Sequence, residues 1–340
     1  MTEINFYIIL LFFSYFLVII SRKISPFFIV SSVVFIMLSF YLRSLVSFET
    51  NADYYGYYML VQNDFELKVT SVFSEPYFPL AYTLIKSIID GDRLFSEQAL
   101  NSIYYINLCI TIIFYLWLAI LRDVRPWLKI FLFSFFYFLI GYTTIRNSIA
   151  YMLFAVLCYE IFHNRRFITG YFSFLFHVSS LPAIGAAAIG LKKITFKFFI
   201  YILVGVCCFV SLLNLPIFNH ISKKLEAYSN LNGTGTDGHG IFHLIFLVLI
   251  IGATVWVYFR DKKVIFNNFF ISMFVLYIVL FVVNPVMAFR FSSYVVFYLC
   301  MYPYEKYKYD KVLTFLSLVP LCINFIFSFF SNHPYFSGLE

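Results

Sequence analysis

Long apolar runs, separated by short polar turns, recur along almost the whole chain. Most of them approach the roughly 20 apolar residues that a helix needs to cross the hydrocarbon core of a bilayer. Since lipid offers no hydrogen bonds to the backbone, such runs are expected to be helical. The pattern predicts an all-α polytopic integral membrane protein of about ten transmembrane helices. The candidate spans lie near residues 4–20, 27–42, 103–121, 127–144, 148–162, 198–213, 241–259, 264–283, 288–302 and 312–330.

The apolar run at 168–190 differs from the others because polar residues interrupt its centre. His177, Ser179 and Pro182 fall between two halves that are each too short to cross a bilayer. The pattern predicts a re-entrant or broken segment, which is tolerated at membrane depth where protein or a water-filled cavity surrounds it. A full crossing by this run is the alternative.

Short basic turns separate many of the predicted spans. Cytoplasmic loops carry an excess of Lys and Arg, so these turns are expected in the cytoplasm. Both termini then face outward, and residues 1–340 form a single transmembrane domain with external (periplasmic) segments at about 43–101 and 214–240. The turns are Arg22-Lys23, 122–125, Arg165-Arg166, Lys192-Lys193, 260–263 and 306–311.

The composition narrows the class of protein further. Hydrophobic residues make up 62% of the chain and charged residues 12%, whereas a soluble domain carries about 25% charged residues. A soluble catalytic domain and a nucleic-acid partner are therefore not expected. The Gly-rich stretch at 232–240 lacks the Lys-Ser/Thr of a P-loop and predicts a mobile external loop. Neither Cys nor His residues show ligand spacing, so no metal and no other cofactor are expected.

Two arginines lie beside apolar spans, at the ends that the predicted topology places outside. Arg146 follows Thr143-Thr-Ile, and Arg290 follows Pro285-Val-Met-Ala-Phe. A charged side chain costs about 2.5–3.5 kcal/mol at the centre of a span. A charge this close to a span therefore also needs a reason. One reading is that each side chain extends to lipid phosphate. The other is a paired anion clamp, because the planar guanidinium matches phosphate oxygens.

Three further polar residues are candidates for acid–base chemistry. Asp53 lies among tyrosines in 51–58, which suits a sugar site or a solvated loop beside an aromatic belt. Glu75 precedes Pro76 and either begins a helix or acts as a base. His177 is either a hydrogen-bonded core residue or a proton carrier.

Taken in order, these motifs resemble the EpsG/Wzy-like family of bacterial polysaccharide polymerases. Asn147 follows the arginine where that family often has glutamine, which is a departure. The motifs are Asp53-Tyr54 with Tyr57, Glu75-Pro76-Tyr77, Ile145-Arg146 with Ile149-Ala150, His177 with Ser179, and Arg290 with Tyr294.

The resemblance implies a GT-C-like glycosyltransferase architecture and a metal-independent reaction. A growing glycan would be transferred from undecaprenyl diphosphate to the next lipid-linked repeat unit, at the periplasmic face of the bacterial inner (cytoplasmic) membrane. The product would be O-antigen, capsule or exopolysaccharide. The implied partners are undecaprenyl-diphosphate-linked oligosaccharide repeat units and membrane lipid, with a chain-length regulator as a further candidate.

The same resemblance suggests roles for individual residues. The leaving diphosphate needs positive charge, and the acceptor hydroxyl needs a base whose pKa is raised by a partly dry cavity. The candidates are Arg146 and Arg290 for the diphosphate, Asp53, Glu75 and His177 for catalysis, and Tyr57, Tyr58, Tyr77 and Tyr294 for the sugar.

Other functions share parts of this pattern. A lipid-linked oligosaccharide flippase would place charge along a central path through the spans, whereas this chain gathers charge outside them. A monomeric GT-C glycosyltransferase or an O-antigen ligase would use the same donor with another acceptor. A non-catalytic scaffold would need neither the outward arginines nor the carboxylates.

Overall fold

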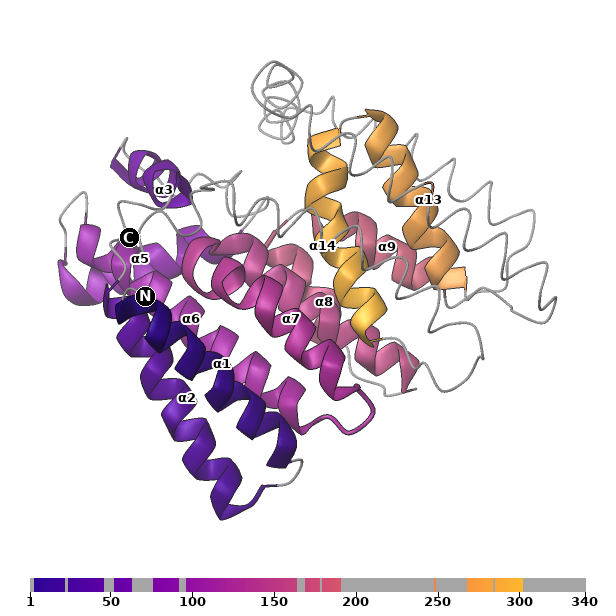
Figure 1. Ribbon diagram of the computed structural model, residues 1–340. Coiled ribbons are helices and arrows are strands. Elements are labelled where there is room, and N and C mark those ends of the chain that lie inside the picture. Colours follow the sequence, from indigo (N-terminus) through magenta and orange to yellow (C-terminus); the bar gives the residue numbers. More distant parts are fainter. Residues whose placement is uncertain are drawn as a thin grey trace. The chain divides into compact units, whose positions relative to one another are not determined.

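Every regular element in the described part of the chain is a helix (Figure 1). The computed structural model describes residues 3–21, 24–45, 52–62, 76–91, 96–163, 169–177, 179–190, 248, 268–283 and 285–301. For these residues the predicted all-α class is confirmed.

Two of the helices depart from α-helical geometry, since η1 is a π-helix and η2 is a 3₁₀-helix. In chain order, the helices are α1 (Glu3–Ser21), α2 (Pro26–Leu45), α3 (Ala52–Gln62), α5 (Tyr77–Ile89), α6 (Glu97–Ile120), α7 (Pro126–Phe138), η1 (Leu139–Thr143), α8 (Arg146–Phe162), η2 (Thr169–Leu175), α9 (Ser180–Gly190), α13 (Asn268–Val283) and α14 (Pro285–Met301).

Most of the predicted spans coincide with these helices. Pro26–Leu45, Glu97–Ile120 and Pro126–Thr143 are long and apolar enough to cross a membrane, and Phe6–Ser21 and Tyr77–Ile89 are shorter apolar helices. The spans expected near 198–213, 241–259 and 312–330 lie outside the described residues apart from Val248, as does the Gly-rich stretch at 232–240. The total of ten spans stays a prediction. The matched spans are 4–20, 27–42, 103–121, 127–144, 148–162, 264–283 and 288–302.

Local sequence signals explain where several helices begin and end. Pro26 and Pro126 each occupy the first position of a helix, where the missing N–H of proline costs nothing. Ser96 caps α6, because its Oγ accepts a hydrogen bond of 3.0 Å from Ala99 N. Gly91 follows α5 with φ of 60°, a backbone conformation that glycine adopts readily.

The described residues divide into two compact units. The first holds the helices from α1 to η2, and the second holds α9, α13 and nearly all of α14. The predicted break in 168–190 is confirmed, because η2 ends at Leu175 and α9 begins only at Ser180. Whether this segment returns to the same side of the membrane stays a prediction.

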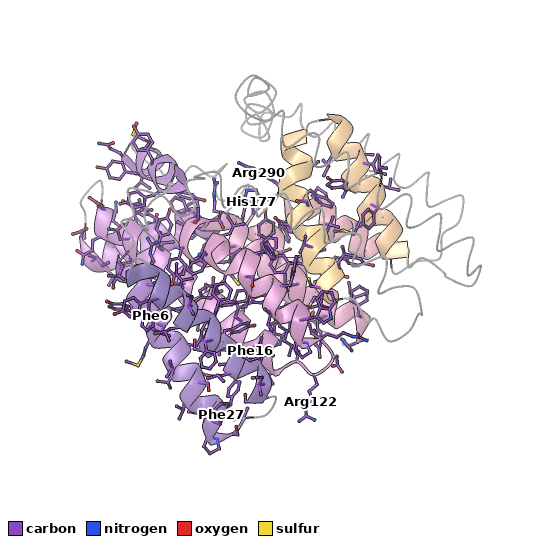
Figure 2. The ribbon with its side chains drawn as sticks, in the orientation of Figure 1. Phe6, Phe16, Phe27, Arg122, His177 and Arg290 are labelled. Carbon is purple, nitrogen blue, oxygen red and sulfur yellow. The ribbon has the colours of Figure 1, made fainter. Side chains whose placement is uncertain are left out.

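In the first unit, α1 and α2 expose large apolar side chains. Phe6, Phe16 and Phe27 project outward from them in Figure 2, and Val30 and Met37 are also exposed, with Met37 at 66%. In a chain that belongs in a bilayer, such a surface is the expected lipid-facing side.

Tyrosines fill the interior of the same unit. The Tyr15 ring stacks on Phe133 with centroids 4.2 Å apart, and both side chains are buried. Tyr115 Oη donates to Leu132 O at 2.9 Å, so the buried hydroxyl has a partner. These tyrosines therefore stabilise the packing between helices.

The two ends of α6 carry different polar groups. At the C-terminal end, Arg122 lies in the exposed turn between α6 and α7 (Figure 2). Lys129 Nζ donates there to Leu121 O and, at 2.7 Å, to Ala119 O. At the N-terminal end, α6 packs against α3 and α5, and this end holds the candidate site.

Candidate active site

Arg146 is the first residue of α8 and follows a break in the helical backbone. η1 ends at Thr143, and Thr144 and Ile145 lie between the two helices. Arg146 Nε donates a hydrogen bond of 3.1 Å to Tyr57 Oη, and its Cζ lies 5.2 Å from the centroid of the Tyr57 ring. Both contacts hold the half-buried guanidinium against α3.

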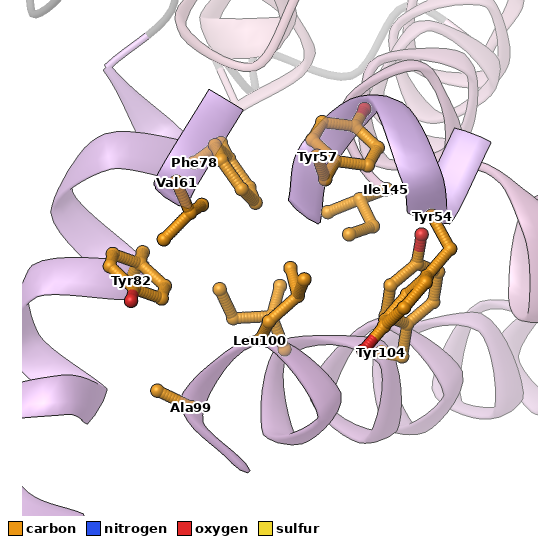
Figure 3. Packing of buried hydrophobic residues seen from close by; sticks show 10 residues of the cluster. Tyr54, Tyr57, Val61, Phe78, Tyr82, Ala99, Leu100, Tyr104 and Ile145 are labelled. Carbon is orange, nitrogen blue, oxygen red and sulfur yellow. The ribbon is translucent and has the colours of Figure 1, made fainter. Parts of the chain in front are cut away.

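Tyr57 belongs to a buried aromatic cluster that joins α3 to α5, α6 and the turn before α8 (Figure 3). The Tyr57 and Phe78 ring centroids are 4.6 Å apart, and those of Tyr54 and Tyr104 are 5.7 Å apart. Ile145, the neighbour of Arg146 in sequence, is fully buried in it. The members of the aromatic cluster are Tyr54, Tyr57, Val61, Phe78, Tyr82, Ala99, Leu100, Ile103, Tyr104 and Ile145.

Hydrogen bonds fix the aromatic cluster to the start of α6. Tyr54 Oη donates to Glu97 Oε1 at 3.2 Å, and Tyr82 Oη accepts from Ser96 N at 2.9 Å. Burial raises the pKa of Tyr82, so its hydroxyl stays neutral. Short helices that could not hold their positions alone are thereby anchored to a long one.

Tyr77 extends the aromatic cluster toward His177. Its ring centroid lies 4.9 Å from that of Phe176, and it packs against the cluster. Burial, with a smaller contribution from nearby Tyr57, raises the pKa of Tyr77 to about 12, so the hydroxyl is neutral and able to donate. His177 follows Phe176, is 8% exposed, and its backbone N donates to Ser173 O at 3.2 Å.

The remaining candidates of this unit are placed less completely. Asp53 lies in the first turn of α3, four positions before Tyr57, and only its backbone is described. Glu75 lies outside the described residues, directly before Pro76. Tyr58 is half-buried and packs against the aromatic cluster. The structure therefore brings Arg146, Tyr57 and Tyr77 to one cluster and leaves the roles of the two carboxylates as predictions.

The second unit holds Arg290 and Tyr294, one turn apart on α14. Arg290 is half-buried, whereas Tyr294 is fully buried. Tyr294 Oη and Ser179 Oγ are 3.0 Å apart in a hydrogen bond, which joins the motif containing Ser179 to that containing Arg290. The pairing of Arg290 with Arg146 on one diphosphate stays a prediction.

Two buried polar residues were not identified as site residues from the sequence. Arg43, at the end of α2, is 1% exposed, donates from Nη1 to Tyr142 O at 3.3 Å and lies 5.4 Å from the Tyr104 ring centroid. Asn107, inside α6, is fully buried and bonded to the turn before Arg146. For Arg43, the sequence offered one indication, which is a lone arginine at the end of an apolar run. Nothing in the sequence indicated Asn107.

Within the described residues, no three His, Cys, Asp or Glu side chains lie close enough together to form a metal site.

Comparison with known proteins identified a family. A sequence model of the EpsG family matches residues 32–338, which is nearly the whole chain. No curated protein and no solved structure matches the chain. The GT-C-like architecture accordingly stays a prediction.

Proposed function

The chain belongs to the EpsG family, a Wzy-like polymerase family, as its motifs predicted, and on this premise we propose that it polymerises lipid-linked oligosaccharide repeat units. The donor is a growing glycan on undecaprenyl diphosphate, and the acceptor is the next lipid-linked unit. The reaction takes place at the periplasmic face of the bacterial inner membrane. The products are chains of O-antigen, capsule or exopolysaccharide.

The chemistry is a glycosyl transfer that needs no external energy source. The bond between the donor sugar C1 and the diphosphate oxygen breaks, and the acceptor hydroxyl oxygen bonds to C1. The acceptor proton passes to a base, and the electron pair of the broken bond stays on the diphosphate. Catalysis therefore requires positive charge beside the leaving diphosphate and a base beside the acceptor hydroxyl.

The observation that carries this proposal is the position of Arg146. It begins α8, where the backbone N–H groups of a helix favour an anion. Tyr57 fixes its orientation through Nε, and a guanidinium carries five N–H donors in a planar fork, which suits bidentate binding of phosphate. Arg290 is proposed as the second cation of the same diphosphate site.

The other candidate residues are given roles that agree with their burial. Tyr58 is partly exposed, so it can face a sugar. The Tyr77 hydroxyl is neutral and buried, with no hydrogen-bond partner among the described residues, so its proposed role is to donate to a sugar oxygen that reaches it on binding. Tyr57 and Tyr294 are buried and contribute to the sugar site mainly by holding Arg146 and Ser179. The proposed base is Asp53, Glu75 or His177, and replacing each in turn tests which one removes the proton.

A complementation experiment tests the function. The gene is deleted in its native host and restored as wild type, Arg146→Ala or Arg122→Ala, with protein amounts checked by blot and surface polysaccharide resolved on a gel. Arg122 is the matched control because it is exposed in the turn at the other end of α6. We expect a full ladder from wild type and Arg122→Ala, and a single repeat unit from Arg146→Ala.

The other outcomes separate the alternatives. A full ladder in the deletion strain would exclude a polymerase. Loss of even the single unit would indicate a flippase or an earlier transferase, and retention of a free polymer that fails to reach its final acceptor would indicate a ligase.

A further inference from the structure

The backbone leaves α-helical geometry directly before Arg146. η1 is a π-helix, and Thr144 N donates to Leu139 O at 3.0 Å, which is the bond between residues five apart that defines this geometry. Such turns are rare and are frequent at functional sites. The position of Arg146 thus depends on how this irregular stretch is held.

The side-chain amide of Asn107, in α6, bridges the stretch. Nδ2 donates to Ile140 O at 2.6 Å and to Thr144 O at 3.0 Å, and Oδ1 accepts from Ser148 Oγ at 2.6 Å. One amide therefore reaches the π-helix, the break and the first turn of α8. Arg146 lies between the last two contact points.

The packing beside Asn107 leaves η1 little freedom. A Cβ added at Gly141 would lie 3.3 Å from Thr111 Cγ2, closer than side chains normally pack, and 3.4 Å from Leu108 Cδ1, which is the start of ordinary contact. η1 therefore approaches α6 closely near Asn107. Because Gly141 has no side chain, η1 can lie close enough to α6 for the Asn107 amide to reach both carbonyls.

The Asn107 amide also supplies hydrogen-bond donors to two backbone carbonyls, which an apolar side chain could not do. The carbonyls of Ile140 and Thr144 are acceptors in an environment with few competing donors, and an unsatisfied buried acceptor is costly. Without the amide, the backbone would have to shift to find other donors. Such a shift would move Arg146 relative to Tyr57.

We propose that Asn107 is a positioning residue for Arg146, one that fixes the π-helical turn and the start of α8 so that the guanidinium meets the diphosphate of the lipid-linked donor. The proposal rests on the proposed function. It assigns no contact between Asn107 and substrate, because the amide is fully buried and its three bonds are within the protein.

Asn107→Leu is the central variant, since it keeps the approximate volume and removes all three bonds. Ser148→Ala is a gentler variant that keeps the amide but removes the hydroxyl whose proton is shared between Oδ1 and Ile145 O, each 2.6 Å away. Thr111→Val is the matched control, because Thr111 is buried one turn away on α6 and its hydroxyl donates to the Asn107 carbonyl, at 2.9 Å, within the same helix. Each is made in the full-length protein, and protein amounts are compared by blot.

The first readout is hydrogen exchange of the peptide that covers residues 139–148, on protein purified in detergent. We expect faster exchange in Asn107→Leu, a smaller increase in Ser148→Ala and none in Thr111→Val. Unchanged exchange in Asn107→Leu would overturn the proposal without reference to activity. If Asn107→Leu does not accumulate, Ser148→Ala carries the same test.

The second readout is polymer output in cells, in the wild-type and Arg146→Lys backgrounds. A displacement of the guanidinium by about 1 Å is expected to lower output by roughly 10- to 100-fold. In the Arg146→Lys background, adding Asn107→Leu should cause little further loss, because both changes disable the same group. A general packing defect would instead multiply the two losses, and that result would overturn the proposal.

The proposed function and the positioning role of Asn107 fail in different ways. A full ladder in the deletion strain would remove the proposed function, whereas full output from Arg146→Ala would remove the diphosphate role of Arg146 and, with it, the reason to position that residue. Loss of output in Arg146→Ala combined with normal output in Asn107→Leu would remove only the positioning role.

Discussion

Lys129 and Arg146 are two cations of the first unit whose surroundings differ. The Lys129 ammonium lies at the C-terminal end of α6, and Arg146 lies at the N-terminal end of α8. Lys129 is the fourth residue of α7, but its ammonium donates to carbonyls at the C-terminus of α6, where the helix dipole favours positive charge. Arg146 begins α8, where the dipole disfavours it. Lys129 is 3% exposed, whereas Arg146 is half-buried beside Tyr57.

The difference suggests which cation serves the fold and which serves a ligand. Lys129 is placed where elementary helix electrostatics would place it, and its bonds complete the end of α6. Arg146 is placed where those electrostatics cost about 0.3–1 kcal/mol, a penalty that a bound anion at the same N-terminus would offset. We therefore expect the two residues to respond oppositely to removal.

The largest expected effect is on activity, from Arg146→Ala. Loss of a cation that stabilises the leaving diphosphate should lower polymerisation by about 100-fold or more. The melting temperature in detergent should change little, because the lost contact with Tyr57 is offset by removal of a cation from a helix N-terminus. A large fall in melting temperature would instead assign Arg146 to the fold.

The complementary effect is on stability, from Lys129→Met. The carbonyls of Ala119 and Leu121 would lose their donor, at a cost of about 1–3 kcal/mol in the free energy of unfolding. Activity per folded molecule should stay at the wild-type level. Lys86→Met, a change on the partly exposed surface of α5, is the control for loss of a lysine. Lower specific activity in Lys129→Met would contradict the division of roles between the two ends.

Hydrophobic run length predicted the helices well because a bilayer demands a fixed number of apolar residues. The runs at 4–20 and 27–42 differ from α1 and α2 by a few residues at most. The break near His177 was also predicted, since polar residues interrupt an otherwise apolar run. The bounds of a helix and a break within it depend on the residues of one segment alone, so they can be predicted from that segment.

The internal contacts of the site depend on segments far apart in sequence. Arg146 and Tyr57 were both named from the sequence, but they are 89 residues apart and nothing in either segment indicates their hydrogen bond. Asn107 bonds to residues 33 to 41 positions away and looks like any polar residue in an apolar helix. Arg43 was taken as the edge of an external segment, and only its packing reveals its burial.

A smaller effect is expected from Tyr57→Phe, which sharpens the account of how Arg146 is held. The change removes the 3.1 Å hydrogen bond but keeps the ring against Phe78. A net contribution of about 0.5–1.5 kcal/mol corresponds to roughly 2- to 13-fold lower polymerisation. Tyr55→Phe is the control, because Tyr55 is two positions away and 65% exposed. Equal activity in both variants would show that the ring alone orients the guanidinium.

The smallest effect concerns pH and Tyr77→Phe. Because the fold raises the pKa of Tyr77 to about 12, the fold favours the neutral phenol over the phenolate. The resulting stabilisation is fully present below the ordinary tyrosine pKa of about 10 and is lost as the pH rises through about 12. The wild-type melting temperature should therefore fall across this window more steeply than that of Tyr77→Phe.

The pH profile of polymerisation near neutrality should be the same in both proteins, because Tyr77 does not titrate there. A shifted profile in Tyr77→Phe would mean that this hydroxyl acts on the proton of the acceptor, and would place the acid–base chemistry on α5 in place of Asp53, Glu75 or His177.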